Sequence, residues 1–160
     1  MLMMSDIPPD AQNLVRNIKL SGESLLGVIN DVLDFSRIES GKMELEHRPI
    51  DVRTTIAEVA EMLSHVAFDK GLDLLYYIDE EVPESIYGDQ TRLRQVLINL
   101  VGNAIKFTPE GHVVVQVVGM PASEQGTYRI HVTVEDTGIG IPNDKLDDVF
   151  GEFHQVENEK

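Results

Sequence analysis

Three polar side chains near the middle of the chain have the types and spacing to hold a phosphorylated ligand. Asn99 and Asn103 lie four residues apart, and Lys106 follows three residues later. Residues at these spacings lie on adjacent turns of a helix, where they can contact one ligand together. Two amides and an ammonium group suit a hydrated divalent cation with phosphates beside it. For the two asparagines alone, an ordinary half-exposed helix is the better interpretation.

A second group of residues follows a strand-like run and makes a ligand site more plausible than an ordinary helix surface. Asp136 stands before two glycines at alternate positions, Gly138 and Gly140. Glycines allow the backbone to approach a flat ligand closely. The Asp136 carboxylate can accept a hydrogen bond from an exocyclic amine, and Ile139 and Ile141 offer apolar contact. An Asp-Thr-Gly sequence on its own could be a simple turn, but both groups in this order favour a ligand site.

The first group needs a helix to position it, and the sequence predicts one from Asp89 to Thr108. Asp89 is a good N-cap, because its carboxylate can accept hydrogen bonds from the free amides of the first turn. Apolar residues then recur at helical spacing. They predict a buried face that consists of Leu93, Val96, Leu97, Leu100, Val101 and Ala104.

The second group needs a strand before it, and the sequence predicts two strands joined by a loop. β-Branched residues are nearly continuous over 112–118, and apolar residues alternate over 128–135. A strand at 72–78, a short strand at Met43–Glu46 and a helix after Asp51 are also predicted. The expected fold class is α+β, with helices on one face of a mixed, mostly antiparallel sheet.

A long helix is predicted from residue 11 to residue 40. Its apolar residues recur at alternating steps of four and three, which makes a heptad seam typical of helix bundles. The seam consists of Leu14, Ile18, Ser21, Leu25, Val28, Val32 and Phe35. Such a helix could fold back onto the rest of the chain or pair with a second copy.

The composition limits the possible partners and compartments. The formal net charge is −15, from 13 Lys and Arg against 28 Asp and Glu, and no basic face for nucleic acid is visible. The absence of cysteine excludes a disulfide scaffold and thiol catalysis. No apolar run approaches the roughly 20 residues that a membrane span needs. We therefore expect a cytoplasmic chain without nucleic-acid or membrane contacts.

Three segments resemble the ATP-binding boxes of sensor histidine kinases. Residues 99–108 (N-x-x-x-N-A-x-K-F-T) resemble the N box, residues 136–140 (D-x-G-x-G) the G1 box, and residues 150–153 (F-G-E-F) the F box. Residues 29–42 are similar to the second dimerisation helix, especially that of the hybrid type. The resemblance covers nearly the whole chain, and three boxes in register make it specific.

The resemblance implies an α/β sandwich that binds ATP and Mg²⁺ between its helices and a flexible lid. It implies that Asn103 ligates Mg²⁺, that Asn99 positions the ion or its waters, and that Lys106 contacts a phosphate. It further implies domains at 1–42, the second dimerisation helix, and at 43–160, the ATP-binding catalytic domain.

The other site residues follow from the resemblance in the same way. Asp136 matches the residue that recognises adenine, Gly138 and Gly140 match the close-approach positions, and Ile141 borders the nucleotide. The aromatic residues complete the implied site: Phe107 beside the nucleotide, and Phe150 and Phe153 at the base of the lid. All three aromatic residues would fit a plain packing role as well.

The resemblance also implies a parent protein that transfers the γ-phosphate of ATP to a His and then to the Asp of a response-regulator receiver domain. It implies a homodimer formed through residues 11–40, and it allows a membrane-anchored parent. None of the five histidines has the sequence context of the family's phosphoacceptor, and no glycine-rich lid motif occurs by Lys160. We therefore expect no catalytic residue here, no autophosphorylation by these 160 residues alone, and weak or absent ATP binding that depends little on Mg²⁺.

Two other function classes stay open. A hydrolytic ATPase of the same superfamily carries a carboxylate base at the position of Asn99, and an amide cannot replace that base at neutral pH. A non-catalytic module that dimerises and docks partners, a pseudokinase, fits the missing boxes but not the intact nucleotide-binding residues.

Overall fold

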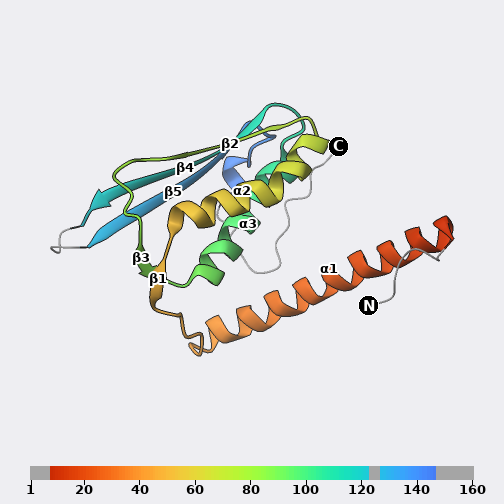
Figure 1. Ribbon diagram of the computed structural model, residues 1–160, viewed down its shortest axis with the longest axis horizontal. Coiled ribbons are helices and arrows are strands. Elements are labelled where there is room, and N and C mark those ends of the chain that lie inside the picture. Colours follow the sequence, from red (N-terminus) through yellow and green to blue (C-terminus); the bar gives the residue numbers. More distant parts are fainter. Residues whose placement is uncertain (1–7, 123–126, 147–160) are drawn as a thin grey trace. The chain divides into compact units, whose positions relative to one another are not determined.

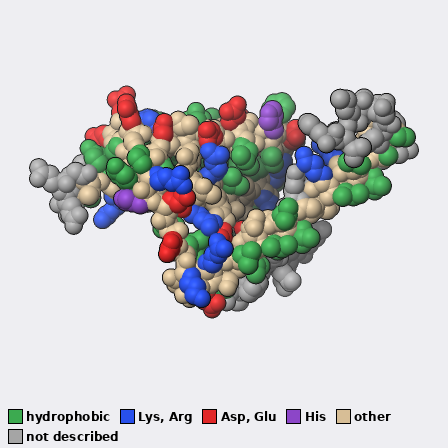
Figure 2. Space-filling view, turned by 60° about the horizontal axis from the view of Figure 1, so that its bottom comes forward, with side chains coloured by type: hydrophobic (Ala, Val, Ile, Leu, Met, Phe, Trp, Pro, Cys, Tyr) green, Lys and Arg blue, Asp and Glu red, His purple; other side chains and the backbone are tan. Residues whose placement is uncertain are grey.

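The computed structural model describes residues 8–122 and 127–146, and the chain divides into two compact units between Glu44 and Leu45. The first unit contains helix α1 (Pro9–Glu39), close to the predicted bounds. After Ser40, Gly41 adopts a φ of +65°, which ends the helix in the left-handed region that glycine tolerates. Apolar side chains gather along α1 (Figure 2) and are more than half exposed at Leu14, Ile18, Leu25, Leu26, Val28, Val32 and Leu33.

The second unit contains the remaining helices and strands of the described residues. In chain order these are β1 (Arg48–Ile50), α2 (Val52–Asp69), β2 (Asp73–Ile78), β3 (Ile86–Gly88), α3 (Gln90–Phe107), β4 (His112–Pro121), β5 (Tyr128–Asp136) and a 3-10 turn (Asn143–Lys145).

A mixed sheet in the order β2-β4-β5 is the centre of the second unit. Strand β2 pairs with β4 in parallel, and β4 pairs with β5 as an antiparallel hairpin. Strands β1 and β3 form a separate antiparallel pair. Helices α2 and α3 pack side by side on one face of the mixed sheet (Figure 1). This arrangement confirms the predicted α+β fold class.

The core lies between this sheet and the two helices. Val113, Val115 and Val117 of β4 are almost completely buried, and Leu97 and Val101 of α3 pack into the same cluster. Burying a side chain of this kind contributes about 1.5–3 kcal/mol, so the middle of α3 is held firmly on the sheet. Among the described residues, no helix has both the length and the apolar character needed to cross a membrane.

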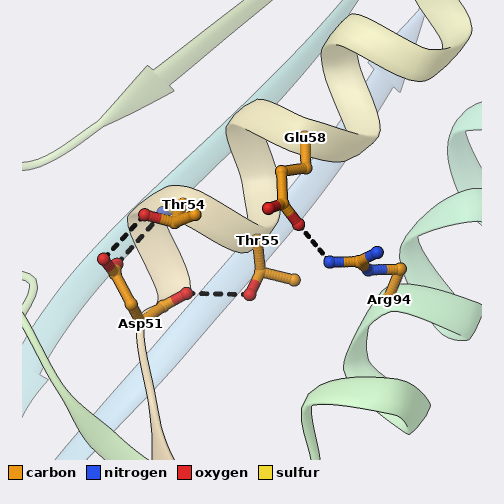
Figure 3. Close-up of polar contacts among 5 residues, drawn as sticks. All are labelled: Asp51, Thr54, Thr55, Glu58 and Arg94. Atoms are coloured by element: carbon orange, nitrogen blue, oxygen red, sulfur yellow. Dashed lines mark hydrogen bonds and ion pairs between the residues drawn. The ribbon is translucent and has the colours of Figure 1, made fainter.

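The start of α2 shows how local sequence determines a helix boundary (Figure 3). Asp51 accepts hydrogen bonds from the backbone N–H of Thr54 (3.0 Å) and from its hydroxyl (2.7 Å). These bonds, the backbone one first, hold the pKa of the Asp51 carboxyl below its ordinary value. An ion pair between Glu58 of α2 and Arg94 of α3 joins the two helices.

The short strand predicted at Met43–Glu46 is wrong. The structure has no strand there, and β1 begins at Arg48 instead. The reason is that neighbouring helix ends use these amides. The Met43 N–H donates to the carbonyl oxygen of Arg37, and the Glu46 N–H donates to Oδ2 of Asp89.

Candidate nucleotide site

Helix α3 positions the first group of polar residues, as predicted. Asp89 caps the helix by accepting a hydrogen bond from the N–H of Arg92 (3.0 Å). That bond, together with the one from the Glu46 N–H, lowers the pKa of the Asp89 carboxyl. Further along the helix, Asn99 and Asn103 are both exposed, so their amides are available to a ligand.

The predicted buried face of α3 is partly wrong. Leu97, Val101 and Ala104 are buried, but Val96 is 54% exposed and Leu100 is 48% exposed. The face of α3 that packs against the core includes Ile105, which is 2% exposed. Val96 and Leu100 therefore form an apolar surface outside the core. The exposed side of the helix carries, at steps of three and four residues, Val96, Leu100, Asn103 and Phe107. The apolar surface therefore lies on the same side of α3 as the Asn103 amide.

The loop after β5 lies against the end of α3. The backbone N–H of Ile139 donates to the carbonyl oxygen of Phe107 at 3.3 Å. A Cβ atom added to Gly138 would lie 2.5 Å from the same oxygen, which is far closer than side chains tolerate. The glycine of the Asp-x-Gly sequence is therefore required by a close approach to the helix end. This contact brings the two predicted groups of residues together.

Asp136 is oriented by its own loop. Its Oδ1 accepts a hydrogen bond from the backbone N–H of Gly138 at 2.9 Å. Oδ2 accepts none within the described part of the chain, and the side chain is exposed. A carboxylate held in this way has one oxygen available to an external donor. Gly140 follows with a φ of +69° and nothing within 4 Å of an added Cβ, so this part of the loop is open.

Thr137 fastens the loop to the sheet, a role that the sequence interpretation missed. Its Oγ1 accepts a hydrogen bond from the N–H of His112 (3.0 Å), and the hydroxyl lies 3.2 Å from the carbonyl oxygen of Glu110. The Thr137 N–H also donates to the carbonyl of His112. The signal was a threonine between Asp136 and Gly138, because hydroxyl side chains often bond to nearby loop backbone.

Lys70, at the C-terminal end of α2, is a second residue that the sequence interpretation missed. Its Nζ lies within hydrogen-bonding distance of the carbonyl oxygens of Ile105, Lys106 and Thr108. These contacts close the C-terminal end of α3. The lysine is 35 positions from the first of these partners, so no local pattern could have revealed it.

The surface around this junction combines exposed apolar side chains with positive charge. Phe107 is 44% exposed, Ile139 58% and Ile141 48%. The Lys106 ammonium lies 4.9 Å from the centre of the Phe107 ring, a cation–π distance. Exposed apolar side chains beside a carboxylate and an ammonium suit a ligand with a flat ring and a negative group. Phe150 and Phe153 lie outside the described residues.

The donor set for a metal consists of amides. The described residues contain no group of three or more His, Asp or Glu side chains that could hold an ion. Asn103 and Asn99 offer neutral amide oxygens, which Mg²⁺ accepts when waters and phosphates complete its shell. The residues therefore fit Mg²⁺ as a companion of bound phosphate and do not fit an ion held by protein alone.

Comparison with known proteins agrees with this geometry. Residues 88–160 match the family described as histidine kinase-, DNA gyrase B-, and HSP90-like ATPase. The chain is 41% identical over 97% of its length to the signal transduction histidine-protein kinase BarA of Escherichia coli (strain K12). It is 37% identical over 99% of its length to the hybrid signal transduction histidine kinase A of Dictyostelium discoideum. It spans 17% and 8% of these relatives, respectively.

A solved structure shows the same fold. The crystal structure of full-length ShkA in complex with AMPPNP superimposes with a TM-score of 0.76 at 34% identity, over 94% of this chain and 31% of that one. These findings support a catalytic-domain fragment of a sensor histidine kinase, in which residues 88–160 match the ATPase family model. The resemblance to that family and the fold class predicted from the sequence are confirmed.

Proposed function

We propose that this chain is the ATP-binding core of a histidine kinase and that it binds ATP where the loop after β5 meets the end of α3. The observation that carries the proposal is the contact of Gly138 and Ile139 with the Phe107 carbonyl. It joins the carboxylate-bearing loop to the helix that carries the amides. The similar protein ShkA has a crystal structure in complex with AMPPNP, which supports ATP binding by this chain.

The carboxylate is proposed to recognise the base. One oxygen of Asp136 is held by the Gly138 N–H, so the other can accept a hydrogen bond from the exocyclic amine of adenine. Ile139 and Ile141 are exposed on the same loop and can cover the ring. A hydrogen bond to a charged acceptor contributes about 1.5–3 kcal/mol, enough to favour adenine over a base that presents a carbonyl there.

The helix is proposed to hold the phosphates. Asn103, with Asn99 beside it, would ligate Mg²⁺ or its waters, and Lys106 would contact a phosphate oxygen. When bound, Mg²⁺ neutralises phosphate charge during transfer. Position 99 carries an amide, which cannot take a proton from water at neutral pH. The site therefore favours transfer of the γ-phosphate to a protein side chain over rapid hydrolysis.

The partners follow from the family and from α1. We propose that the whole protein passes the phosphate from ATP to a His and then to an Asp of a response-regulator receiver domain, in the cytoplasm. The exposed heptad seam of α1 is proposed to pair with a second copy of the chain, because an apolar surface of this length is costly in water. The proposed domains are 1–42 for dimerisation and 43–160 for ATP binding.

The test is nucleotide binding by a matched pair of variants. In a protein that contains this chain and binds ATP, Asp136→Asn should weaken binding by at least ~1.5 kcal/mol, since a charged acceptor is replaced by an amide. Asp144→Asn makes the same charge change at an exposed position in the 3-10 turn and should bind as the wild type does. Isothermal titration calorimetry measures both, and equal affinity for wild type and Asp136→Asn would refute the assignment.

A further inference from the structure

The last turn of α3 is closed by a side chain from another helix. The Lys70 ammonium lies 2.6 Å from the carbonyl oxygen of Ile105, 3.0 Å from that of Lys106 and 3.1 Å from that of Thr108. An ammonium group has three donors, so these contacts use all of them. The last carbonyls of a helix have no partner within it and carry partial negative charge. Lys70 gives these carbonyls hydrogen-bond donors and places a positive charge beside their partial negative charge.

The carbonyl of Phe107 lies between those of Lys106 and Thr108, which Lys70 binds, and it accepts a hydrogen bond from the loop instead. The Ile139 N–H donates to it, and Gly138 lies against it. The position of this oxygen depends on the course of the backbone from Ile105 to Thr108. Lys70 fixes that backbone on both sides of Phe107.

The lysine is itself well placed to act as a fixed support. It stands at the C-terminal end of α2, where the Leu72 N–H donates to the carbonyl of Ala67 at 3.0 Å. Both Ala67 and Leu72 are buried, with 1% and 5% exposure. The side chain of Lys70 therefore starts from a backbone that the core holds in place.

We infer that Lys70 is a positioning residue of the nucleotide site, an inference that rests on the proposed function of that site. It holds the end of α3 in the arrangement that accepts the Asp136–Ile139 loop. Without it, the last turn frays, the Phe107 carbonyl moves, and the carboxylate and amides no longer face one ligand. Lys70 touches neither nucleotide nor metal in this scheme.

The test compares Lys70→Met, Lys70→Arg and the wild type by NMR on the full chain. In Lys70→Met we expect exchange of the Thr108 amide, which donates to Ala104, to become about tenfold faster, equivalent to about 1.4 kcal/mol. The amide resonance of Ile139 should shift. A chemical-shift titration with ADP should show a dissociation constant raised about tenfold. Lys70→Arg keeps a cationic donor and should restore most of each change.

A matched control separates positioning from general loss of stability. Arg53, near the other end of α2, donates to the carbonyl oxygens of Asp79, Glu80 and Val82 at 2.7, 3.3 and 3.1 Å. Arg53→Met thus removes a cation that also bonds three carbonyls, but at a turn outside the site. It should leave the Ile139 resonance and the ADP dissociation constant unchanged.

The outcomes are distinct for the two claims. If Lys70→Met leaves the Thr108 and Ile139 amides unchanged, or if Arg53→Met alters them equally, the positioning role is wrong. If the wild type does not bind ADP at all, the proposed function fails, while the amide measurements still decide whether Lys70 holds the helix end. If Lys70→Met binds ADP as tightly as the wild type does, the positioning role alone is overturned.

Discussion

The close approach of Gly138 to α3 predicts a large effect from one methyl group. In Gly138→Ala the added Cβ would lie 2.5 Å from the carbonyl oxygen of Phe107 and 2.7 Å from Oδ1 of Asp136. Ordinary contact begins near 3.4 Å, so the loop must move away by about 0.9 Å. Overpacking of this kind costs about 1–3 kcal/mol, and losing the Ile139 hydrogen bond adds about 1 kcal/mol. We expect unfolding to become easier by about 2–4 kcal/mol.

The matched control is the same substitution at Gly102, in the middle of α3. An added Cβ there meets nothing within 4 Å. Alanine is a better helix former than glycine by about 0.5–1 kcal/mol, so Gly102→Ala should stabilise the chain. The same chemical change should therefore have opposite signs at two positions.

Urea denaturation followed by circular dichroism measures both variants, with the midpoint and slope fitted separately. The reasoning is refuted if Gly138→Ala unfolds at the wild-type midpoint, because the loop would then not be held against the helix. It is also refuted if both alanine variants shift the midpoint in the same direction.

Three other predictions follow from particular contacts. Val32→Glu should abolish self-association in sedimentation equilibrium, because it places a charge in the α1 seam, while Asn30→Glu on the same helix should not; an unchanged mass for Val32→Glu would exclude this interface. Thr137→Val should lower the free energy of unfolding by about 1–2 kcal/mol through the lost bonds to β4, whereas Thr133→Val, at an exposed position of β5, should not. The folded-state pKa of Asp89 is lowered, so the stability that its carboxylate contributes is present above the unfolded pKa of about 3.9 and is lost as the pH falls through the lower folded value. Asp89→Asn can still cap the helix, so this variant should lose less stability than the wild type in acid denaturation below about pH 4. Parallel denaturation curves would contradict this prediction.

Local signals predicted much of the fold. The cap at Asp89 determines where α3 begins, and the hairpin follows from β-branched residues on either side of a loop. The alternating glycines predicted a close approach of the backbone to a ligand, which stays a prediction; the close approach seen at Gly138 is to the carbonyl oxygen of Phe107. These features depend on neighbours in the chain, which the sequence displays directly.

Contacts between distant residues could not be predicted in this way. Lys70 binds carbonyls 35 to 38 positions away, and a lysine at a helix end carries no mark of such a partner. Periodicity also failed to predict which face of α3 packs against the sheet. Val96 and Leu100 fit an apolar helical face as well as Leu97 does, and only the packing of the sheet selects the one that is buried. The roles of the individual site residues and the domain bounds stay predictions.

The parallel pairing of β2 with β4 has a consequence for how the chain folds. Strands β4 and β5 are neighbours in sequence, so their hairpin closes a short loop and can form early. Strand β2 reaches β4 only after the intervening segment, α3 included, has been looped out, which makes its pairing slow. The carboxylate loop belongs to the hairpin and the amides belong to the intervening helix. The proposed nucleotide site is therefore completed late in folding, and a nucleotide that binds the finished site would shift the equilibrium away from partly folded chains.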